Sequence, residues 1–152
     1  MLFPTHLVAA YVLGRWMQLP IVPILIGAAL PDVIDKPLAM LGLVDLYHSI
    51  GHSLLALGLL SIVLLFGERW IAFCIGWASH LVLDALQMVL NGRPDDIQFL
   101  LWPFIHHQPA VDLPPVQFAI YYVGTFAFWV EIAIWILFFA ILLTSRKQQV
   151  TE

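Results

Sequence analysis

Ionisable side chains recur inside long apolar segments of this chain, and that combination limits the structures it can form. Of its 152 residues, 62% are hydrophobic and only 11% are charged. A soluble domain normally carries about 25% charged residues. We therefore expect the bilayer to be its solvent and the fold to be an all-α, polytopic membrane helical bundle.

Four segments are apolar enough to enter a membrane, and the first differs from the others. Arg15, Gln18, Pro20 and Pro23 interrupt it. At about 1.5 Å per residue, neither of the two remaining pieces crosses a hydrocarbon core of roughly 30 Å. We expect a short helical hairpin, re-entrant or thinning the bilayer, followed by three transmembrane helices. The predicted elements of this single integral membrane domain, 1–152, are the hairpin 2–30, the helices 48–66, 70–90 and 118–144, and a proline-rich loop or lid at 91–115.

The charge distribution argues against a nucleic-acid partner. The formal net charge is −4, and Arg146 with Lys147 is the only pair of adjacent basic residues. Binding to nucleic acid depends on a basic patch, so we expect no nucleic-acid partner. The single cysteine, Cys74, lies in an apolar run and cannot form an intrachain disulfide, so we expect it to be a small core residue.

Seven residues of the types that bind divalent metals lie within the first 84 positions. They are His6, Asp32, Asp35, His48, His52, His80 and Asp84. An aspartate near the centre of a membrane helix costs at least about 2.5 kcal/mol, so such residues indicate function. The pairs at 48 and 52 and at 80 and 84 have the spacing that places both members on one helical face. Helical bundles build internal metal centres from such pairs.

The expected depths of these residues agree with a single site. If the hairpin turns at Gln18–Pro20, the histidine at its start and the first aspartate after its end return to the same membrane face. His48 and His52 open the next helix on that face. The histidine and aspartate of helix 70–90 lie in its second half, roughly 9 to 15 Å from its end. We therefore predict one metal pocket partway into the membrane.

Structural interpretations of the same residues stay open. A membrane histidine can form hydrogen bonds between helices instead of binding a metal. Asp32 and Asp35 could cap a helix that follows Pro31. His48 could lie outside the membrane, in water.

Three further ionisable residues have less defined roles. His106 and His107 lie in the proline-rich loop without a partner at helical spacing, so we expect surface or lid roles for them rather than ligation. Glu131 lies near the middle of the helix predicted at 118–144, where an unpaired carboxylate would be costly. Its partner could be Arg15, the backbone or a neighbouring helix, and a role as general base is a further interpretation.

Five motifs occur in order between residue 5 and about residue 104. They are TH at positions 5 and 6, ALPDVID, YHSIGHSLL, SHLVLDAL and LLWPF. Together they resemble the YdjM-like family of membrane-bound metal-dependent hydrolases, described as LexA-regulated in enterobacteria. The resemblance implies an inner-membrane hydrolase whose metal ligands are His6, Asp32, Asp35, His52, His80 and Asp84. One departure is Ser49 after His48, where the family is expected to have an arginine that would help to hold a substrate anion.

A mixed site of histidines and carboxylates is typical of metal centres that activate water for hydrolysis. We expect one or two divalent ions, zinc first and manganese or iron as alternatives. The expected substrate is a membrane lipid or another amphiphilic phosphoester, and Asp35 or Asp84 could act as the catalytic base. Two other functions stay open: a metal or proton transporter, and a non-catalytic membrane protein with a structural metal site.

Basic residues in the short loops predict the orientation. Arg15, Arg69, Arg146 and Lys147 are expected opposite the site, and Lys36 and Arg93 on its side. Positive residues favour the cytoplasmic face. We therefore expect a multi-pass protein of the plasma (inner) membrane with an outward-facing site and a cytosolic C-terminus.

Overall fold

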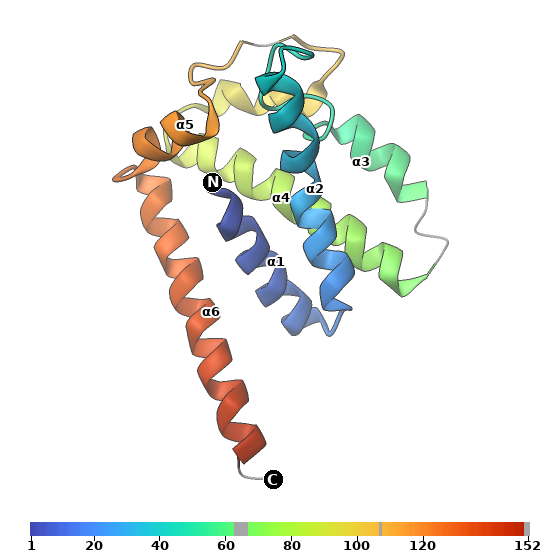
Figure 1. The fold of residues 1–152 in the computed structure, drawn as a ribbon, viewed down its shortest axis with the longest axis vertical. Helices are drawn as coiled ribbons and strands as arrows, with labels where there is room; N and C mark the ends of the chain where they lie inside the picture. The colour runs from blue at the N-terminus through green and yellow to red at the C-terminus, as the bar shows by residue number, and fades with distance from the viewer. Residues whose placement is uncertain (63–66, 107, 151–152) are drawn as a thin grey trace.

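The computed structural model is all-helical and describes residues 1–62, 67–106 and 108–150. No strand occurs in these residues. The helices are α1 (Phe3–Met17), α2 (Ile21–Met40), α3 (Leu54–Ser61), α4 (Glu68–Leu90), the 3₁₀ helix η2 (Pro94–Leu101), α5 (Pro115–Tyr122) and α6 (Phe126–Val150). Figure 1 shows α1 and α2 side by side in front of α4, with α6 beside α1.

The hairpin expected at 2–30 is present as α1 and the first half of α2. Gln18 adopts the left-handed conformation that ends α1, with φ of 58°. The prediction that the hairpin ends near residue 30 was wrong, because α2 continues to Met40 with Pro31 and Pro37 inside it. Membrane helices tolerate proline where neighbouring elements cover the disturbed turn. Here the loop before α3 covers it, since a Cβ on Gly51 would lie only 2.8 Å from the Pro31 carbonyl oxygen.

The helix expected at 48–66 begins six residues later than predicted. Residues 48–53 form a loop, and α3 starts at Leu54 with Ser53 as its N-cap, whose side chain accepts a hydrogen bond from the Ala56 N–H. Residues 63–66 lie outside the described residues. The eight residues of α3 extend about 12 Å, too little to cross a bilayer.

Of the two helices predicted after residue 66, the structure confirms one and divides the other. The helix predicted at 70–90 is confirmed as α4. The single helix predicted at 118–144 was wrong, because Gly124, with φ of 87°, separates α5 from α6. Within the described residues, two helices are long and apolar enough to cross a membrane, Glu68–Leu90 and Phe126–Leu143, so three transmembrane helices are not confirmed.

Two glycines bring the backbones of α2 and α4 into close contact. A Cβ on Gly27 would lie 1.9 Å from the Phe73 carbonyl oxygen, and a Cβ on Gly76 would lie 2.0 Å from the Ile24 carbonyl oxygen. Small residues permit such close approach between membrane helices. Because Asp32 and His80 lie about one turn beyond this crossing, the contact sets the distance between the polar residues of the two helices.

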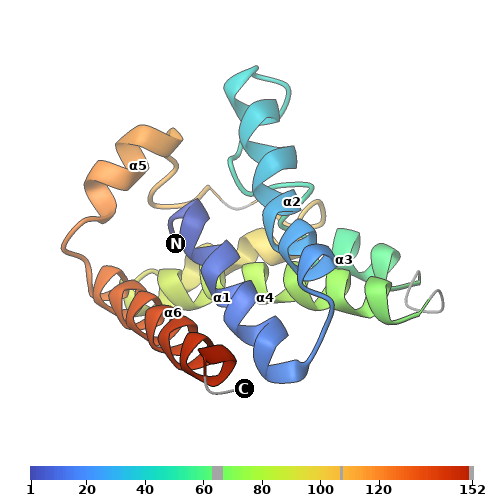
Figure 2. The same cartoon turned by 60° about the horizontal axis from the view of Figure 1, so that its bottom comes forward.

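The start of α1 lies between α5 and the second half of α2 (Figures 1 and 2). Met1, Tyr122 and Ala127 are buried together there and form a small core that includes the start of α6. A second core, around Trp77, joins α4 to η2 and α3. The first residues of the chain are therefore held at the end of the bundle that carries the second halves of α2 and α4.

Candidate metal centre

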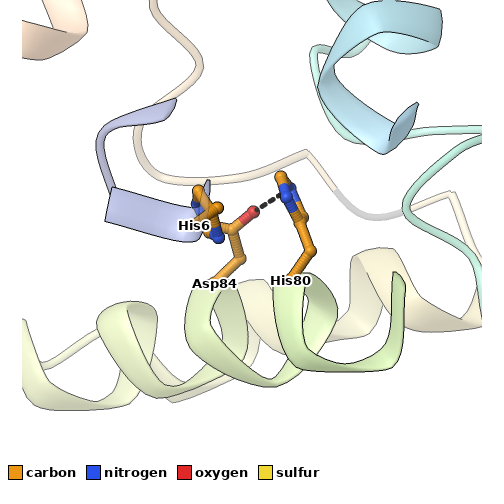
Figure 3. A group of neighbouring side chains, drawn as sticks. All are labelled: His6, His80 and Asp84. Atoms are coloured by element: carbon orange, nitrogen blue, oxygen red, sulfur yellow. Dashed lines mark ion pairs between the residues drawn. The ribbon is translucent and has the colours of Figure 1, made fainter. Parts of the chain in front are cut away.

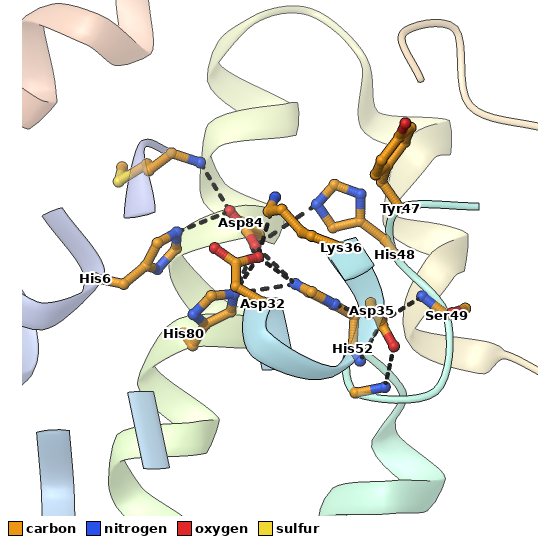
Figure 4. A network of polar contacts seen from close by, with 12 residues as sticks. His6, Asp32, Asp35, Lys36, Tyr47, His48, Ser49, His52, His80 and Asp84 are labelled. Atoms are coloured by element: carbon orange, nitrogen blue, oxygen red, sulfur yellow. Dashed lines mark hydrogen bonds and ion pairs between the residues drawn. The ribbon is translucent and has the colours of Figure 1, made fainter. Parts of the chain in front are cut away.

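Six of the seven predicted metal ligands meet at one end of the bundle (Figure 4). In the described residues they form three groups whose ligand atoms lie within 4.8 Å of one another. The groups are His6, His80 and Asp84; Asp32, His52 and His80; and His48, His52 and Asp84. Because each group shares residues with another, the three form one continuous cluster.

The helix α4 supplies two members of this cluster from consecutive turns. His80 Nε2 lies 3.1 Å from Asp84 Oδ2, as Figure 3 shows. On the other side of the carboxylate, His6 Nε2 from α1 lies 3.2 Å from Asp84 Oδ1. The rings of His6 and His80 stack with centroids 3.8 Å apart. The four-residue spacing predicted from the sequence thus places both α4 side chains toward the first turn of α1.

The helix α2 and the loop before α3 complete the cluster. His52 Nε2 lies 3.0 Å from His80 Nε2, and Asp32 Oδ1 lies 3.4 Å and 3.7 Å from these two nitrogens. His48 is the outermost member, with its Nε2 3.8 Å from Asp84 Oδ2. His48 and His52 reach the site from the loop, so the prediction that they share one face of a helix was wrong although their convergence is real.

Two histidines are oriented by partners behind them. His80 Nδ1 lies 2.7 Å from the Ala28 carbonyl oxygen, which can only accept, so this nitrogen carries the proton. His52 Nδ1 lies 2.7 Å from Asp35 Oδ2 in the same arrangement. Metal-binding histidines commonly donate their second nitrogen in this way. In the neutral rings, two Nε2 lone pairs face each other, an arrangement that a proton or a metal cation between them relieves.

The carboxylates around His52 favour a positive charge at its imidazole. His52 lies in the loop before α3, outside both helices that could cross a membrane. Burial by itself lowers the pKa of its imidazole, but the hydrogen bond with Asp35 and the nearby carboxylates of Asp32 and Asp84 outweigh burial and raise the pKa to about 10. The carboxylates therefore create a site for a cation.

Several buried atoms of the cluster have close ion-pair contacts but no well-aligned hydrogen bond. Both ring nitrogens of His6 and both carboxylate oxygens of Asp32 are in this group, although the two residues are only 1% and 5% exposed. The Lys36 ammonium lies 3.0 Å from Asp32 Oδ1 as an ion-pair partner. Buried polar atoms are nearly always hydrogen-bonded in native proteins. Ring nitrogens and carboxylate oxygens without such bonds are suitable ligand atoms for a divalent metal.

Asp35 differs from the other predicted ligands, because its oxygens face the loop before α3. Oδ2 accepts hydrogen bonds from the backbone N–H groups of Ser49 and His52, at 2.7 and 3.2 Å, and Oδ1 accepts from Gly51 at 2.8 Å. Asp35 is not a member of any of the three groups. The structure places it where it orients His52, while coordination of a metal by Asp35 itself stays a prediction.

The segment 91–115 folds over the same end of the bundle. Within it, Asp96 accepts hydrogen bonds from the Arg93 side chain and the Ala110 N–H, at 2.8 and 3.0 Å. Asp112 accepts from the Tyr47 N–H at 3.3 Å, which ties this segment to the loop before α3. Burial raises the pKa of the Asp112 carboxyl, against the Tyr47 hydrogen bond and the Lys36 charge.

Of the two histidines predicted for the lid, His106 does not join any of the groups found in the described residues. His106 is exposed. His107 lies outside the described residues. The expected surface or lid role thus agrees with the exposure of His106.

Glu131 is buried and finds its partners on α1. The Thr5 hydroxyl donates a hydrogen bond to Glu131 Oε1, and the Leu2 N–H donates to Oε2 at 3.4 Å. Trp135 Nε1 donates to the Thr5 oxygen at 3.1 Å. Arg15 is exposed on the last turn of α1, so the interpretation as a contact with a neighbouring helix is the one the structure confirms. Sequence analysis missed Thr5, whose only signal is its place beside His6.

A pocket of about 420 Å³ opens beside the cluster. It lies among the start of α1, the second half of α2 and the start of α5, and its lining is mostly apolar, with Asp32 and Lys36 as the charged residues among those that form it. A smaller cavity on the other side of Lys36 is lined in part by His48 and Asp84. The histidine–aspartate cluster can therefore be approached from an apolar pocket.

This fold and this site define a helical membrane protein with an internal histidine–aspartate centre at one end of its bundle. The chain belongs to the YdjM inner membrane protein family, which it matches over residues 1–150. The membership in the YdjM family predicted from the sequence motifs is thus confirmed, while the hydrolase activity stays a prediction. No curated protein and no solved structure matches the chain.

Proposed function

We propose that this protein is a membrane-embedded, metal-dependent hydrolase of a phosphoester in an amphiphilic or lipid-linked substrate. The observation that carries the proposal is the cluster of six buried or half-buried histidine and aspartate side chains next to an apolar pocket. Catalytic metal sites combine such ligands with an open coordination position. An apolar pocket beside them suits a substrate that is already in the membrane.

The three groups suggest which residues would hold one or two ions. His6, His80 and Asp84 form one site, and Asp32, His52 and His80 form a second that shares His80. A bound divalent ion, zinc first and manganese or iron as alternatives, would lower the pKa of a water ligand to about 7 and polarise a phosphoryl oxygen. Asp84 would serve either as a ligand of that ion or as the base: its Oδ1 accepts a hydrogen bond from the Met1 ammonium at 2.7 Å, and its Oδ2 faces His48 and His80.

The other residues around the site hold these side chains in place. Asp35 and the Ala28 carbonyl fix the ring orientations of His52 and His80. Val111, Asp112 and Leu113 line the small cavity beside His48 and Asp84, and the hydrogen bond from the Tyr47 N–H to Asp112 would hold them there and limit access of water. Exclusion of water strengthens the electrostatic interactions on which such a reaction depends.

The structural-metal alternative is weakened by the number of ligands. A structural zinc site is closed with four ligands. The cluster offers six residues and lies beside an open pocket, which favours a site that leaves a position for substrate. The transporter alternative requires polar residues along a path to the opposite face, whereas the buried polar residues of α4 lie in its second half.

Metal content tests the proposal most directly. We expect one to two equivalents of metal in the detergent-purified protein, measured by plasma mass spectrometry, and loss of that metal in His80→Ala. Ser79→Ala is the matched control, because Ser79 donates only to the Gly76 carbonyl on its own helix. Phosphate release from lipid phosphates should require the metal and be lost in His80→Ala alone. Metal that is sub-stoichiometric, equal in both variants and not restored by addition would contradict the proposal.

An outward-facing site is the second part of the proposal. Asp95 on η2 is exposed at the end of the molecule that carries the site, and Glu68 is exposed at the opposite end of α4. In a Cys74→Ala background and intact cells, a membrane-impermeant maleimide should label Asp95→Cys and leave Glu68→Cys unlabelled. The reverse pattern would place the site on the cytosolic side.

A further inference from the structure

The pocket beside the metal cluster has an apolar and a charged part. Phe3, Val33, Pro37 and Phe118 are among the residues that form its apolar walls, and its volume of about 420 Å³ lies within the range of small-ligand sites. Val33 is 56% exposed and Phe3 is 38% exposed, so the pocket opens to the surroundings of the bundle. Such walls suit a hydrocarbon chain that enters sideways from the bilayer.

Lys36 stands between this pocket and the metal cluster. It lines both the large apolar pocket and the smaller cavity that includes His48 and Asp84. Its ammonium pairs with Asp32 Oδ1 at 3.0 Å, and Asp32 belongs to one of the three groups of candidate ligands. Figure 4 shows Lys36 directed toward Asp32 and Asp84 from the α2 side of the cluster.

We infer that this pocket binds one hydrocarbon chain of a lipid phosphate and that the Lys36 ammonium binds its phosphate at the edge of the metal cluster. The inference rests on the proposed function only in assigning the phosphoester as the reacting group. The occupant follows from the charges: Lys36 would repel a cationic headgroup and a neutral one would gain nothing from its charge, whereas a phosphate can share the ammonium with Asp32. Lysine is a common phosphate-binding residue, with three N–H donors on one charge.

The residue directly after His48 provides no cation for a phosphate. Ser49 occupies that position, and its backbone N–H is used by Asp35. Lys36 lies one turn after Asp32 on α2 and reaches the same side of the cluster. A cation for the substrate phosphate is therefore supplied from α2.

Photo-crosslinking tests this inference without requiring catalysis. The protein, treated with chelator and placed in phosphatidylcholine nanodiscs, is exposed to octyl phosphate that carries a diazirine at the end of its chain. Adducts are then located by mass spectrometry. We expect them on the peptides containing Val33 and Phe118, suppressed by excess octyl phosphate but not by octanol or inorganic phosphate.

Two pairs of variants separate the phosphate contact from the chain contact. Lys36→Gln should weaken competition by octyl phosphate about tenfold, the size expected for one charge-assisted contact, whereas Arg15→Gln, on an exposed residue of α1, should not. Val33→Trp should reduce adducts by filling the pocket. Val82→Trp, on an exposed residue beside a different apolar cavity, should leave them unchanged.

Each outcome supports or overturns the inference. Adducts spread over α6, or equal competition by octyl phosphate in Lys36→Gln and the original protein, would overturn it. Equal competition by inorganic phosphate would show that the chain is not bound in the pocket and would overturn it as well. The crosslinking is done on metal-free protein, so it tests the lipid site separately from the hydrolase. Adducts at the expected peptides without metal-dependent hydrolysis would support the lipid site and contradict the hydrolase. Hydrolysis without these adducts would contradict only the lipid site.

Discussion

The helices α4 and α6 are both long and apolar enough to cross a membrane, yet they relate to the rest of the molecule in opposite ways. In the apolar window of α4, 44% of the residues are buried inside the protein, against 11% in α6. The buried residues of α4 include His80 and Asp84, both in the metal cluster. Apolar length alone therefore does not distinguish a helix that builds a site from one that faces lipid.

The difference comes from what each helix presents to its neighbours. In α4, Gly76 permits close contact with α2, and Trp77 donates a hydrogen bond to the Gly51 carbonyl at 2.9 Å. In α6, large apolar side chains such as Trp129 and Ile136 are 60% and 65% exposed, as expected for contact with lipid. These contacts make α4 the helix that organises the site, whereas the exposed apolar surface of α6 suits a helix that anchors the bundle in lipid.

Of the substitutions that test this comparison of α4 with α6, Gly76→Ala should have the largest effect. Its added Cβ would lie 2.0 Å from the backbone oxygen of Ile24. Separation of α2 from α4 should cost about 3 kcal/mol of stability, the upper range for overpacking. It should also lower metal content, since Asp32 moves away from His80. Thermal unfolding in detergent and metal analysis measure the two effects.

Gly58→Ala is the control for this prediction. Gly58 has no atom within 4 Å of its added Cβ, so the substitution should be neutral or slightly stabilising through helix propensity. Equal stability of the two variants would show that the α2–α4 contact does not hold the site together.

Asp35→Asn should have the next largest effect, and it acts on the loop that faces α4. The amide keeps the shape of the carboxylate but binds the His52 ring and the loop N–H groups less strongly. Loss of such an orienting partner typically lowers metal affinity about 10- to 100-fold. Competition with a chelating dye measures this affinity.

A matched change at an exposed carboxylate is the control for Asp35. Asp95→Asn, on η2, should leave metal affinity unchanged because Asp95 is exposed. Complete loss of metal in Asp35→Asn, as in His80→Ala, would instead indicate that Asp35 is itself a ligand.

The parts of the site that could be predicted from sequence are those set by local geometry. The pair of His80 and Asp84 is fixed by helical spacing, and the turn at Gln18 follows from the polar and proline residues around it. The loop at 48–53 could not be predicted, because its backbone is held by Asp35, a contact with a residue of another element. Two histidines four residues apart in the sequence are compatible with a helix as well as with the loop that the structure shows.

The pocket and the partner of Glu131 were also beyond prediction from sequence. Both depend on how the first turn of α1 lies against α5, α2 and α6, and these segments are far apart in the chain. The break at Gly124 did have a signal, since a glycine in an apolar segment can adopt the positive φ that ends a helix. The continuity of α2 through Pro31 had none, because it depends on packing against α4 and the loop.

Glu131→Ala should have the smallest effect of the three, and it tests whether α6 is only an anchor. The change removes the acceptor for the Thr5 hydroxyl and the Leu2 N–H. Hydrogen bonds between membrane helices contribute on average about 0.6 kcal/mol, so stability should fall by about 1 kcal/mol. Ile136→Ala, at an exposed position of the same helix, should change it less.

Metal affinity should stay within about threefold, the equivalent of one such hydrogen bond, because Glu131 reaches the cluster indirectly: its partners Thr5 and Leu2 adjoin His6 and Met1, which contact Asp84. A tenfold or greater loss of metal affinity, or loss of hydrolysis with metal retained, would place Glu131 in the reaction as a general base and would end the distinction between a site-building α4 and an anchoring α6.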